Sequence, residues 1–322
     1  SVRKFLQEKK TRTATGLDLG FTFSFPVRQE SVASGSLVVW TKGFTARGVV
    51  GRDVVQLLRD ALATEGLDGI RVVALANDTV GTLMTRSYGD PCCDVGVIIG
   101  TGTNACYVER IKNIKKWKAG GCPSLHGSGH MIINMEWGNF NKLRMTRYDR
   151  QLDTGSENPG EQVLEKMVSG MYLGEITRRV LADLAGCGIL FRGIAHDGLD
   201  VPQSFKSEFI TDIEADSSKD LIATAKVLKD IGIRGSTVAD RRIVRETCEM
   251  VSVRAARISA AAIAAVVTKM DPALSKVHTV AIDGSVYEKH PNFSCALASA
   301  LTELFNRKAG RIRVVLSKDG SG

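Results

Sequence analysis

The sequence has little cysteine and proline, with seven of each in 322 residues, and no long uninterrupted apolar run. The number of cysteines is odd and only Cys92 and Cys93 lie close together, so no disulfide framework is expected and a reducing compartment, the cytoplasm, is predicted. No stretch approaches the roughly 18 apolar residues of a membrane span. The richest apolar stretch, 258–267, is dominated by alanine and bounded by Arg257 and Lys269, which predicts a buried helix.

Aromatic residues make up only 6% of the chain, and the basic residues, which give a net charge of +8, are mostly scattered. The one basic cluster, 112–118, contains a single aromatic residue, Trp117, which favours a solvated loop over a nucleic-acid surface. Phosphorylated substrates suit this charge equally well. Cys122, His126 and His130 have a metal-like spacing but lie in a glycine-rich loop without a fourth ligand. Neither a metal site nor a nucleic-acid partner is therefore predicted.

An apolar content of 43% and a charged content of 24% are typical of a globular protein. A chain of this length favours one large domain or two of medium size. The turn at Gly89-Asp90-Pro91 is the expected passage into a second domain. Stretches typical of strands alternate with stretches typical of helices, which predicts an α/β fold.

The stretch 72–84 carries the strongest functional signal. Apolar residues over 72–76 predict a buried strand, the polar triplet Asn77-Asp78-Thr79 follows, and apolar residues then recur at helical spacing. Ligands of open α/β sheets bind beyond the carboxyl ends of the strands, so Asp78 is placed to meet a substrate. The alternative is that this polar pair caps the helix.

Two earlier segments also place polar groups at predicted strand ends. Ser24 lies near the end of a strand over 16–27, which Pro26 stops. A second strand over 36–44 finishes in Thr41-Lys42-Gly43. A helix over 54–63 precedes the central strand.

The segment 95–110 predicts a strand, a tight turn at Gly100-Thr101-Gly102 and a second strand. Two glycines let the backbone approach a phosphate with its N–H groups pointing inward, although an ordinary hairpin turn has the same pattern. The segment is not a P-loop, because no Gly-Lys-Ser/Thr follows.

A strand over 133–140 carries Glu136, and a helix from residue 161 carries Gln162 and Glu165 in its first turn. These two side chains either complement the helix dipole or project into a site. The later elements are predicted in this order: a loop over 193–217, helices over 218–231 and 237–270, a strand over 279–283, a helix over 293–307 and a strand over 311–317.

Amides, carboxylates and hydroxyls thus gather at several strand ends. This mixture suits a polyhydroxylated ligand, because each buried hydroxyl of a sugar needs a hydrogen-bond partner. Glycine-rich turns at 100–102, 283–285 and 320–322 suit a nucleotide.

The sequence resembles the hexokinase family in a series of motifs that follow the family's order and span nearly the whole chain: FTFSFPV, WTKGF, VVALANDTVGT, VIIGTGTNACY, INMEWGNF, NPGEQVLEKMVSGMYLGE, AIDGSVYEKHP and LSKDGSG. The resemblance implies an actin-like, ribonuclease H-like ATPase fold with a sugar cleft between a small lobe, 1–85, and a large lobe, 86–322. It also implies phosphorylation of the 6-hydroxyl of glucose and related hexoses by ATP with Mg²⁺. The variants GTGTN, IDGSVYEK and KDGSG are similar to kinetoplastid-type hexokinases, which makes the glycosome an alternative location.

The resemblance implies a role for each matching residue. Asp78 matches the general base, and Lys42 is the second expected catalytic residue. The expected hexose contacts are Ser24, Phe25, Thr41, Lys42, Asn77, Asp78, Asn104, Glu136, Gln162 and Glu165. The expected nucleotide contacts are Gly100, Thr101, Gly102, Asp283, Gly284, Ser285, Tyr287, Gly320, Ser321 and Gly322.

The chain departs from the family's pattern in two places. The first phosphate loop, of the form LDLGGTNFRV, is echoed only by LDLG at 17–20, so we expect that loop in a segment before Ser1. A glycine usual before the phenylalanine at 205 is replaced by Gln203, which affects an expected adenosine contact. The final Gly-Ser-Gly is expected to lead into a further helix.

A non-catalytic sugar sensor is the alternative function. Such a protein would keep the sugar contacts and lose the phosphate contacts. The presence of Asp78, Lys42, Thr101 and the turn at 283–287 favours the enzyme. The preferred hexose and the oligomeric state are not predicted.

Overall fold

The computed structural model describes residues 2–8, 16–41, 44–115 and 129–317. The described residues divide into two compact units, one ending at Gly81 and the other beginning at Thr82. The division falls inside a helix, a few residues before the boundary expected at 85 and 86.

The described part of the first unit contains these elements in order: α1 Val2–Glu8, β1 Leu17–Thr22, β2 Val27–Ser31, β3 Ser34–Leu37, α2 Val54–Thr64, β4 Ile70–Ala76 and the start of α3 Asp78–Ser87. Strands β1 and β4 are parallel, with Thr22 opposite Ala76, and β2 and β3 form an antiparallel hairpin. The carboxyl ends of β1 and β4 therefore lie at one edge.

Asp53 begins α2 and ties it to the hairpin. Its carboxylate accepts hydrogen bonds from the backbone N–H groups of Val55 at 2.8 Å and Gln56 at 3.3 Å, and from the hydroxyl of Ser34 at 2.7 Å. Burial raises the pKa of Asp53, but these hydrogen bonds outweigh it and lower the pKa. The cap satisfies N–H groups that have no partner inside the helix.

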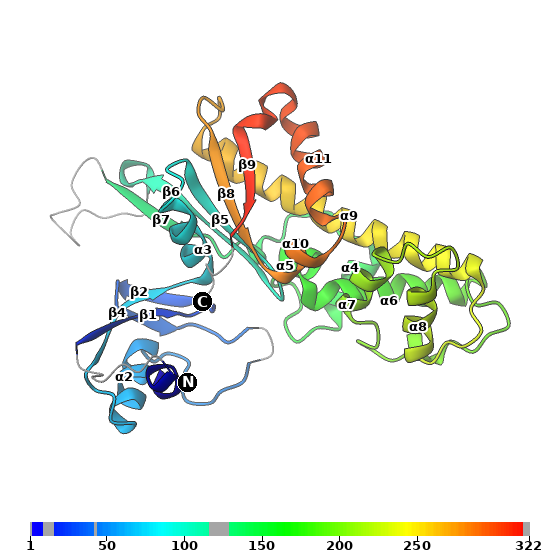
Figure 1. Cartoon of the computed structure of the whole chain (residues 1–322), viewed down its shortest axis with the longest axis horizontal. Helices are drawn as coiled ribbons and strands as arrows, with labels where there is room; N and C mark the ends of the chain where they lie inside the picture. The colour runs from blue at the N-terminus through cyan, green and yellow to red at the C-terminus, as the bar shows by residue number, and fades with distance from the viewer. Residues whose placement is uncertain (1, 9–15, 42–43, 116–128, 318–322) are drawn as a thin grey trace. The chain divides into compact units, whose positions relative to one another are not determined.

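The sheet of the second unit has the strand order β7-β6-β5-β8-β9 among the described residues. The strands are β5 Cys93–Ile99, β6 Thr103–Arg110, β7 His130–Asn134, β8 His278–Asp283 and β9 Ile312–Leu316. β5, β8 and β9 run parallel, whereas β6 is antiparallel to both of its neighbours (Figure 1). β5 and β8 are mostly buried, as expected for central parallel strands. This mixed sheet with its helices confirms the predicted α/β class.

Helices make up most of the rest of the second unit. The α-helices are α4 Arg147–Thr154, α5 Val163–Val168, α6 Gly170–Gly186, α7 Ser207–Glu214, α8 Ile222–Asp230, α9 Val238–Met270, α10 Ser285–Lys289 and α11 Phe293–Phe305. The short 3₁₀ helices are η1 Ile111–Asn113, η3 Trp137–Asn139, η4 Asp197–Leu199 and η5 Asn306–Arg311.

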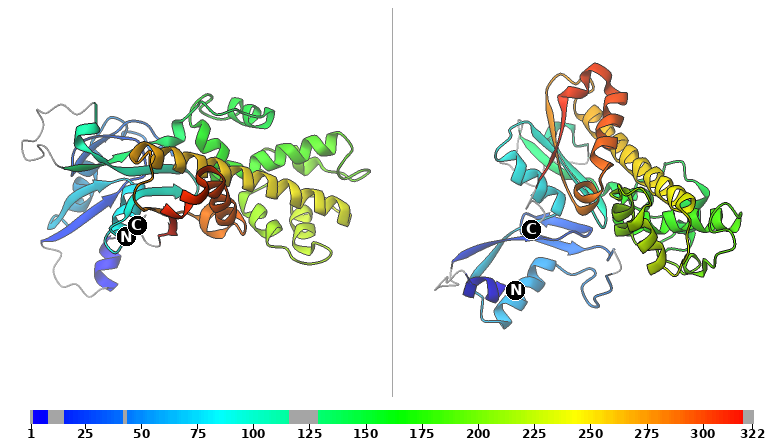
Figure 2. Two further views of the ribbon diagram at one scale, coloured as in Figure 1. Left: turned by 90° about the horizontal axis from the view of Figure 1, so that it is seen from above. Right: turned by 45° about the vertical axis from the view of Figure 1, so that its right-hand side comes forward.

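The long helix α9 is the central helix of this unit. It begins at a capping box in which Thr237 and Asp240 exchange hydrogen bonds, and it packs against α6, α7 and α11 (Figure 2). Its 33 residues are long and apolar enough to cross a membrane, but 56% of its most apolar window is buried inside the protein. Packing within the core accounts for this apolar character, as predicted for 258–267.

A buried histidine links the start of the sheet to the end of α9. The imidazole of His278, which is fully buried, lies 2.9 Å from Asp94 through Nδ1 and 3.4 Å from Asp271 through Nε2. Lys276 adds an exposed ion pair of 3.0 Å with Asp94. The same ring thus contacts two buried carboxylates.

Three predicted strands are shorter than expected. The strand over 16–27 ends at Thr22, and residues 23–26 lead into β2. The strand over 36–44 ends at Leu37, because Pro26, which directly precedes β2 and lies opposite Val38, has no N–H to continue the ladder. Thr41 therefore does not lie at a strand end. The strand over 133–140 ends at Asn134, and Glu136 and Trp137 follow it in a turn.

Two helix predictions are corrected. The single helix from residue 161 is broken at Ser169, whose backbone is extended, because the next two N–H groups bond to the Gly100 and Thr101 carbonyls instead of to the preceding helix turn. The predicted loop over 193–217 contains α7.

The central strand, β4, was predicted as buried throughout, but Val73 is 42% exposed because the strand packs through one face.

Candidate active site

Asn77 caps α3, and Asp78 stands in the first turn of that helix. The side-chain oxygen of Asn77 accepts hydrogen bonds from Thr79, from the backbone N–H at 3.0 Å and from the hydroxyl at 2.8 Å. The Asn77 carbonyl accepts the N–H of Gly81 at 3.1 Å. Asn77 thus fulfils the capping alternative, so Asp78 is not needed as the cap. Asp78 is half-buried, and one of its oxygens accepts the N–H of Thr79 at 2.9 Å.

Ser24 and Phe25 lie beyond the carboxyl end of β1, next to the end of β4. The backbone N–H of Phe23 donates to the Ala76 carbonyl at 2.8 Å, which brings the two strand ends together. Phe25 packs edge-on against Trp40, with ring centroids 4.8 Å apart. This contact fixes the segment that contains Thr41, and Lys42 lies outside the described residues.

In the second unit, Asn104 and Glu136 form a polar cluster with Asn134. The amide of Asn104 donates to Glu136 at 3.2 Å and to Asn134 at 2.8 Å, and the amide of Asn134 donates to Glu136 at 2.8 Å. The backbone N–H of Trp137 donates to Asn104 at 3.3 Å. Strand β6 and the turn after β7 thus hold one carboxylate and two amides together.

Glu165 and Gln162 lie against the same turn. Glu165 is buried, and its carboxylate accepts the backbone N–H of Thr103 at 2.9 Å. A side chain at Gly138 would meet the Gln162 oxygen at 2.5 Å and the Glu165 Cβ at 3.3 Å. A side chain at Gly138 would have to displace the Gln162 amide, so glycine lets η3 pack closely on the start of α5.

The two alternatives for Glu165 can now be separated in part. Glu165 stands in the first turn of α5, but its carboxylate bonds to Thr103 on another segment rather than only to its own helix.

Glu136 and Gln162 both adopt the left-handed backbone conformation, with φ of 51° and 52°. This conformation costs about 1 to 3 kcal/mol for a non-glycine residue and is concentrated at functional sites.

The two predicted glycine turns of the second unit lie in backbone contact. Gly284 has φ of +120°, and a Cβ there would lie 2.5 Å from the Ile99 carbonyl carbon and 2.7 Å from the Gly100 nitrogen. The Gly100 carbonyl accepts the N–H of Gly170, and the Thr101 carbonyl accepts that of Met171. The structure thus brings together the ends of β5 and β8 and the start of α6. Gly320, Ser321 and Gly322 lie outside the described residues.

A small cavity of about 250 Å³ opens beside these turns. Its lining includes Thr101 and Ser285, together with Ser207, Lys289 and His290, which sequence reasoning missed. The hydroxyls and the ammonium group suit the phosphates of a nucleotide, whereas Glu208 adds a carboxylate to the same lining. Ser207 was missed because 193–217 is predicted as a loop. A serine at the start of an apolar pattern with helical spacing nevertheless indicates the start of a helix.

Two further predicted nucleotide contacts, Asp283 and Tyr287, are close in sequence to Ser285, which lines the cavity. The Asp283 carboxylate accepts the N–H of the next residue, Gly284, at 2.6 Å. Tyr287 packs edge-on against Phe293, and burial raises the pKa of its hydroxyl. Neither is among the residues that line the cavity.

Gln203, which stands where the family's pattern has glycine, adopts the left-handed backbone conformation that glycine favours. Its φ is +60°, and its N–H donates to Glu175 at 2.8 Å. The Glu175 carboxylate also forms ion pairs with Arg178 and Arg179.

Burial shifts the pKa values of two further side chains, His290 and Tyr172. Burial lowers the pKa of His290 to about 4, although the Glu208 carboxylate raises it slightly, so the ring is neutral at neutral pH. Burial, together with the charges of Glu165 and Glu157, raises the pKa of Tyr172 to about 12. Tyr172 therefore stays protonated beside Glu165.

Comparison with known proteins identifies the relatives of this chain. Two hexokinase family models match it, one over residues 94–322 and the other over residues 1–88. Human Hexokinase-3 is 44% identical over 98% of this chain, which spans 34% of that relative. Hexokinase-2 of Oryza sativa subsp. japonica is 45% identical over 95% of this chain, which spans 62% of it.

Solved structures agree with the sequence matches. A hexokinase from Schistosoma mansoni, complexed with glucose, has a TM-score of 0.86 and 38% identity over 99% of this chain and 70% of its own. A second hexokinase crystal structure has a TM-score of 0.80 and 32% identity over 100% of this chain and 70% of its own. These matches confirm the predicted actin-like ATPase fold.

Proposed function

Because the chain belongs to the hexokinase family, we propose that the protein phosphorylates glucose and related hexoses from ATP. The observation that carries the proposal is that Thr103 and Asn104, which directly follow the Gly100–Gly102 turn, donate hydrogen bonds to the carboxylates of Glu165 and Glu136 respectively. A sugar site and a phosphate turn on one short segment suit transfer between the two ligands. Because the chain spans about a third of human Hexokinase-3, the activity of the whole protein is part of this proposal.

The hexose is proposed to bind through its hydroxyl groups. Glu136 and Glu165 accept hydrogen bonds from hydroxyls, and the amides of Asn104 and Gln162 donate to their oxygens. Thr103 donates a hydrogen bond to Glu165, and Asn134 donates one to Glu136. These bonds orient the two carboxylates and support their role as hexose contacts. The proposed contacts from the first unit are Ser24, Phe25, Thr41, Lys42, Asn77 and Asp78.

Asp78 is proposed as the general base. Its carboxylate takes the proton of the 6-hydroxyl while that oxygen attacks the γ-phosphorus of ATP. The bond from the γ-phosphorus to the bridging oxygen breaks, and ADP leaves with the electron pair. The cap that Asn77 provides holds Asp78 in the first turn of α3 and supports this role. Lys42 is proposed as a cation near the reacting groups.

ATP is proposed to bind at the glycine turns of the second unit. Thr101, Ser207, Ser285 and Lys289 line the cavity there, and their hydroxyl and ammonium groups fit phosphate oxygens. The described residues hold no group of three or more His, Cys, Asp or Glu residues able to bind a metal. Mg²⁺ is proposed to arrive on the ATP phosphates, where it would neutralise charge during transfer.

A coupled assay with glucose, fructose and mannose tests the proposal. We expect ATP-dependent formation of hexose 6-phosphate, and we expect Asp78→Asn to lower kcat by roughly 10² to 10⁴ with little change in hexose affinity. Near-normal turnover of Asp78→Asn would remove the base assignment. Hexose binding without phosphate transfer, in the full-length gene product, would favour the non-catalytic sensor.

A further inference from the structure

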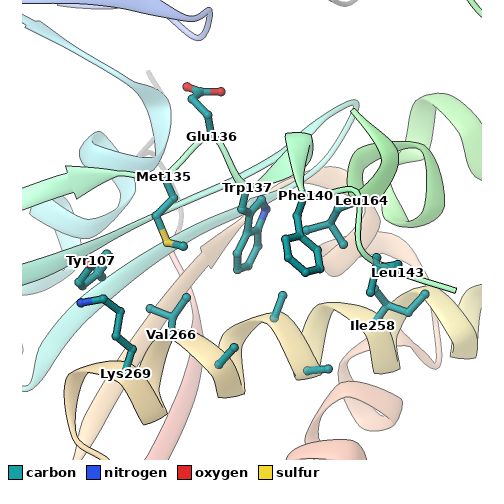
Figure 3. A pocket seen from close by; sticks show the side chains of 13 residues that line it. Tyr107, Met135, Glu136, Trp137, Phe140, Leu143, Leu164, Ile258, Val266 and Lys269 are labelled. Atoms are coloured by element: carbon teal, nitrogen blue, oxygen red, sulfur yellow. The ribbon is translucent and has the colours of Figure 1, made fainter. Parts of the chain in front are cut away.

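Trp137 lies between the proposed hexose contacts of the second unit and the long helix α9. It directly follows Glu136, at the start of η3, and only 6% of it is exposed. Figure 3 shows that the ring of Trp137 points towards α9, whereas the Glu136 carboxylate points the opposite way. Two consecutive residues of one turn thus face a proposed hexose site and the protein interior.

The indole N–H of Trp137 reaches the first residue of β6. Nε1 donates to the hydroxyl of Thr103 at 3.0 Å, and both side chains are buried. The Thr103 hydroxyl in turn donates its single proton to the Ile98 carbonyl at 2.8 Å. The hydroxyl is therefore held from two sides, directly after the Gly100–Gly102 turn.

Thr103 passes this restraint on to Glu165. Its backbone N–H donates to the Glu165 carboxylate at 2.9 Å. Because the hydroxyl and the N–H belong to one residue, a shift of Thr103 moves both of them. The Glu165 carboxylate is buried, where the loss of a hydrogen-bond donor costs more free energy than it does in water. The indole N–H therefore acts on Glu165 through a single residue.

The backbone N–H of Trp137 acts on the second carboxylate. It donates to the side-chain oxygen of Asn104 at 3.3 Å, and the N–H of Ala105 donates to the same oxygen at 2.7 Å. These two bonds fix the amide, whose nitrogen then donates to Glu136 at 3.2 Å. The side chain and the backbone of Trp137 thus act on two different carboxylates.

A cavity behind the Trp137 ring makes its hydrogen bond important. The cavity has a volume of about 640 Å³ and lies between the ring and α9, where Ala261, Ala262 and Ala265 line it (Figure 3). Protein interiors are otherwise close-packed, and packing usually fixes the orientation of a large ring. On this side the ring has room. The bond from Nε1 to Thr103 therefore supplies a directional restraint that packing does not.

We propose that Trp137 is a positioning residue of the hexose site. Its indole N–H orients Glu165 through Thr103. Its backbone N–H orients Glu136 through Asn104. This assignment rests on the proposed function, because the two carboxylates are hexose contacts only under that proposal. Trp137 acts on the affinity for the hexose and not on the transfer of the phosphoryl group.

Trp137→Phe removes the indole N–H and keeps an aromatic ring and the backbone N–H. We expect the Kd for glucose, measured by calorimetry on the full-length gene product, to rise about threefold to tenfold, the usual effect of one hydrogen bond. The KM for glucose should rise while kcat stays within about twofold of the parent value. Tyr148→Phe, which removes a hydroxyl that donates to Asp183, is the matched control and should bind glucose as the parent does. An unchanged Kd in folded Trp137→Phe would overturn the assignment.

Two substitutions at Thr103 test the same path from its other end. Thr103→Val keeps the shape of the side chain and removes the hydroxyl, whereas Thr103→Ser keeps the hydroxyl. We expect Thr103→Val to weaken glucose binding at least as much as Trp137→Phe does, and Thr103→Ser to recover most of the parent affinity. This pair decides the question even if Trp137→Phe does not fold. Equal glucose affinity of the two Thr103 variants would contradict the role of the hydroxyl.

A double-mutant cycle separates positioning from a purely structural role. If the indole acts through Glu165, Trp137→Phe should change glucose affinity by less than about twofold in a Glu165→Ala background. A general loss of packing would lower the affinity by the same factor in both backgrounds, and that result would overturn the assignment. If the parent protein binds no glucose, the hexose site is wrong and the assignment falls with it. If the parent binds glucose and all variants match it, only the assignment is wrong.

Discussion

The carboxylate of Glu165 accepts the backbone N–H of Thr103 at 2.9 Å, across 62 residues of sequence. Both residues are buried, so the bond is shielded from water. It joins the start of α5 to the residue that follows the Gly100–Gly102 turn. One bond therefore orients a proposed hexose contact and links it to a proposed phosphate turn.

Removal of charge from Glu136 or Glu165 should weaken hexose binding. Glu→Gln keeps the size of each side chain and, at Glu165, an oxygen for the N–H of Thr103. We expect the binding free energy for glucose to weaken by about 1.5 to 3 kcal/mol in either variant, the usual contribution of a hydrogen bond to a charged group. Isothermal titration calorimetry measures this. Glu246→Gln, an exposed carboxylate of α9, is the control. Unchanged glucose affinity in both variants would favour the helix-dipole role for Glu165.

An alanine at Gly284 should destabilise the second unit. The φ of +120° is open only to glycine, and the added Cβ would lie 2.5 Å from the Ile99 carbonyl. We expect the free energy of unfolding to fall by at least about 1 to 3 kcal/mol from backbone strain alone. Denaturant titration of Gly284→Ala measures it. Gly186→Ala, at the end of α6 with no atom within 4 Å of the new Cβ, should be neutral or slightly stabilising. Equal stability of the two variants would contradict the contact between the turns.

His278 and Lys276 bond to the same carboxylate but should differ in their effect on stability. His278→Ala leaves Asp94 and Asp271 buried without the ring between them, and we expect a loss of about 3 kcal/mol or more. Lys276→Ala removes a partner of Asp94 whose side chain is 64% exposed, and we expect a change of less than about 1 kcal/mol. Chemical denaturation of both variants compares them. The opposite order would show that the buried network is not what stabilises this end of the sheet.

His290 should make the protein sensitive to acid. The ordinary pKa of histidine is 6.5, and burial lowers the pKa of His290 to about 4 in the folded state. Between these values the unfolded chain binds a proton that the folded chain does not, so a fall in pH favours unfolding. From pH 6.5 to pH 4, stability should fall by up to about 3 kcal/mol more in the parent than in His290→Gln. Unfolding titrations at several pH values measure the difference. His130→Gln, at an exposed histidine, should follow the parent curve, and parallel curves for all three proteins would contradict the assignment.

Local patterns in the sequence predicted much of this protein. The α/β class, most of the strands and helices and the placement of Asp78 after a strand follow from periodicity and from the chemistry of turns over a few residues. The hexokinase motifs named the family, and the matches confirm it. The similarity to kinetoplastid-type hexokinases and the location in the cell stay predictions.

Contacts between distant segments decided the rest. Sequence periodicity predicts a single helix from residue 161, but hydrogen bonds from Gly170 and Met171 to the glycine turn break it at Ser169. The left-handed backbone of Glu136 and Gln162, the bond between Thr103 and Glu165 and the cavity behind Trp137 have no local signal either. Each depends on where another part of the chain packs. The sequence therefore determined which residues are available for chemistry, and only the tertiary structure determined which of them meet, because hydrogen bonding and packing between segments outweigh the small free-energy preferences of each segment alone.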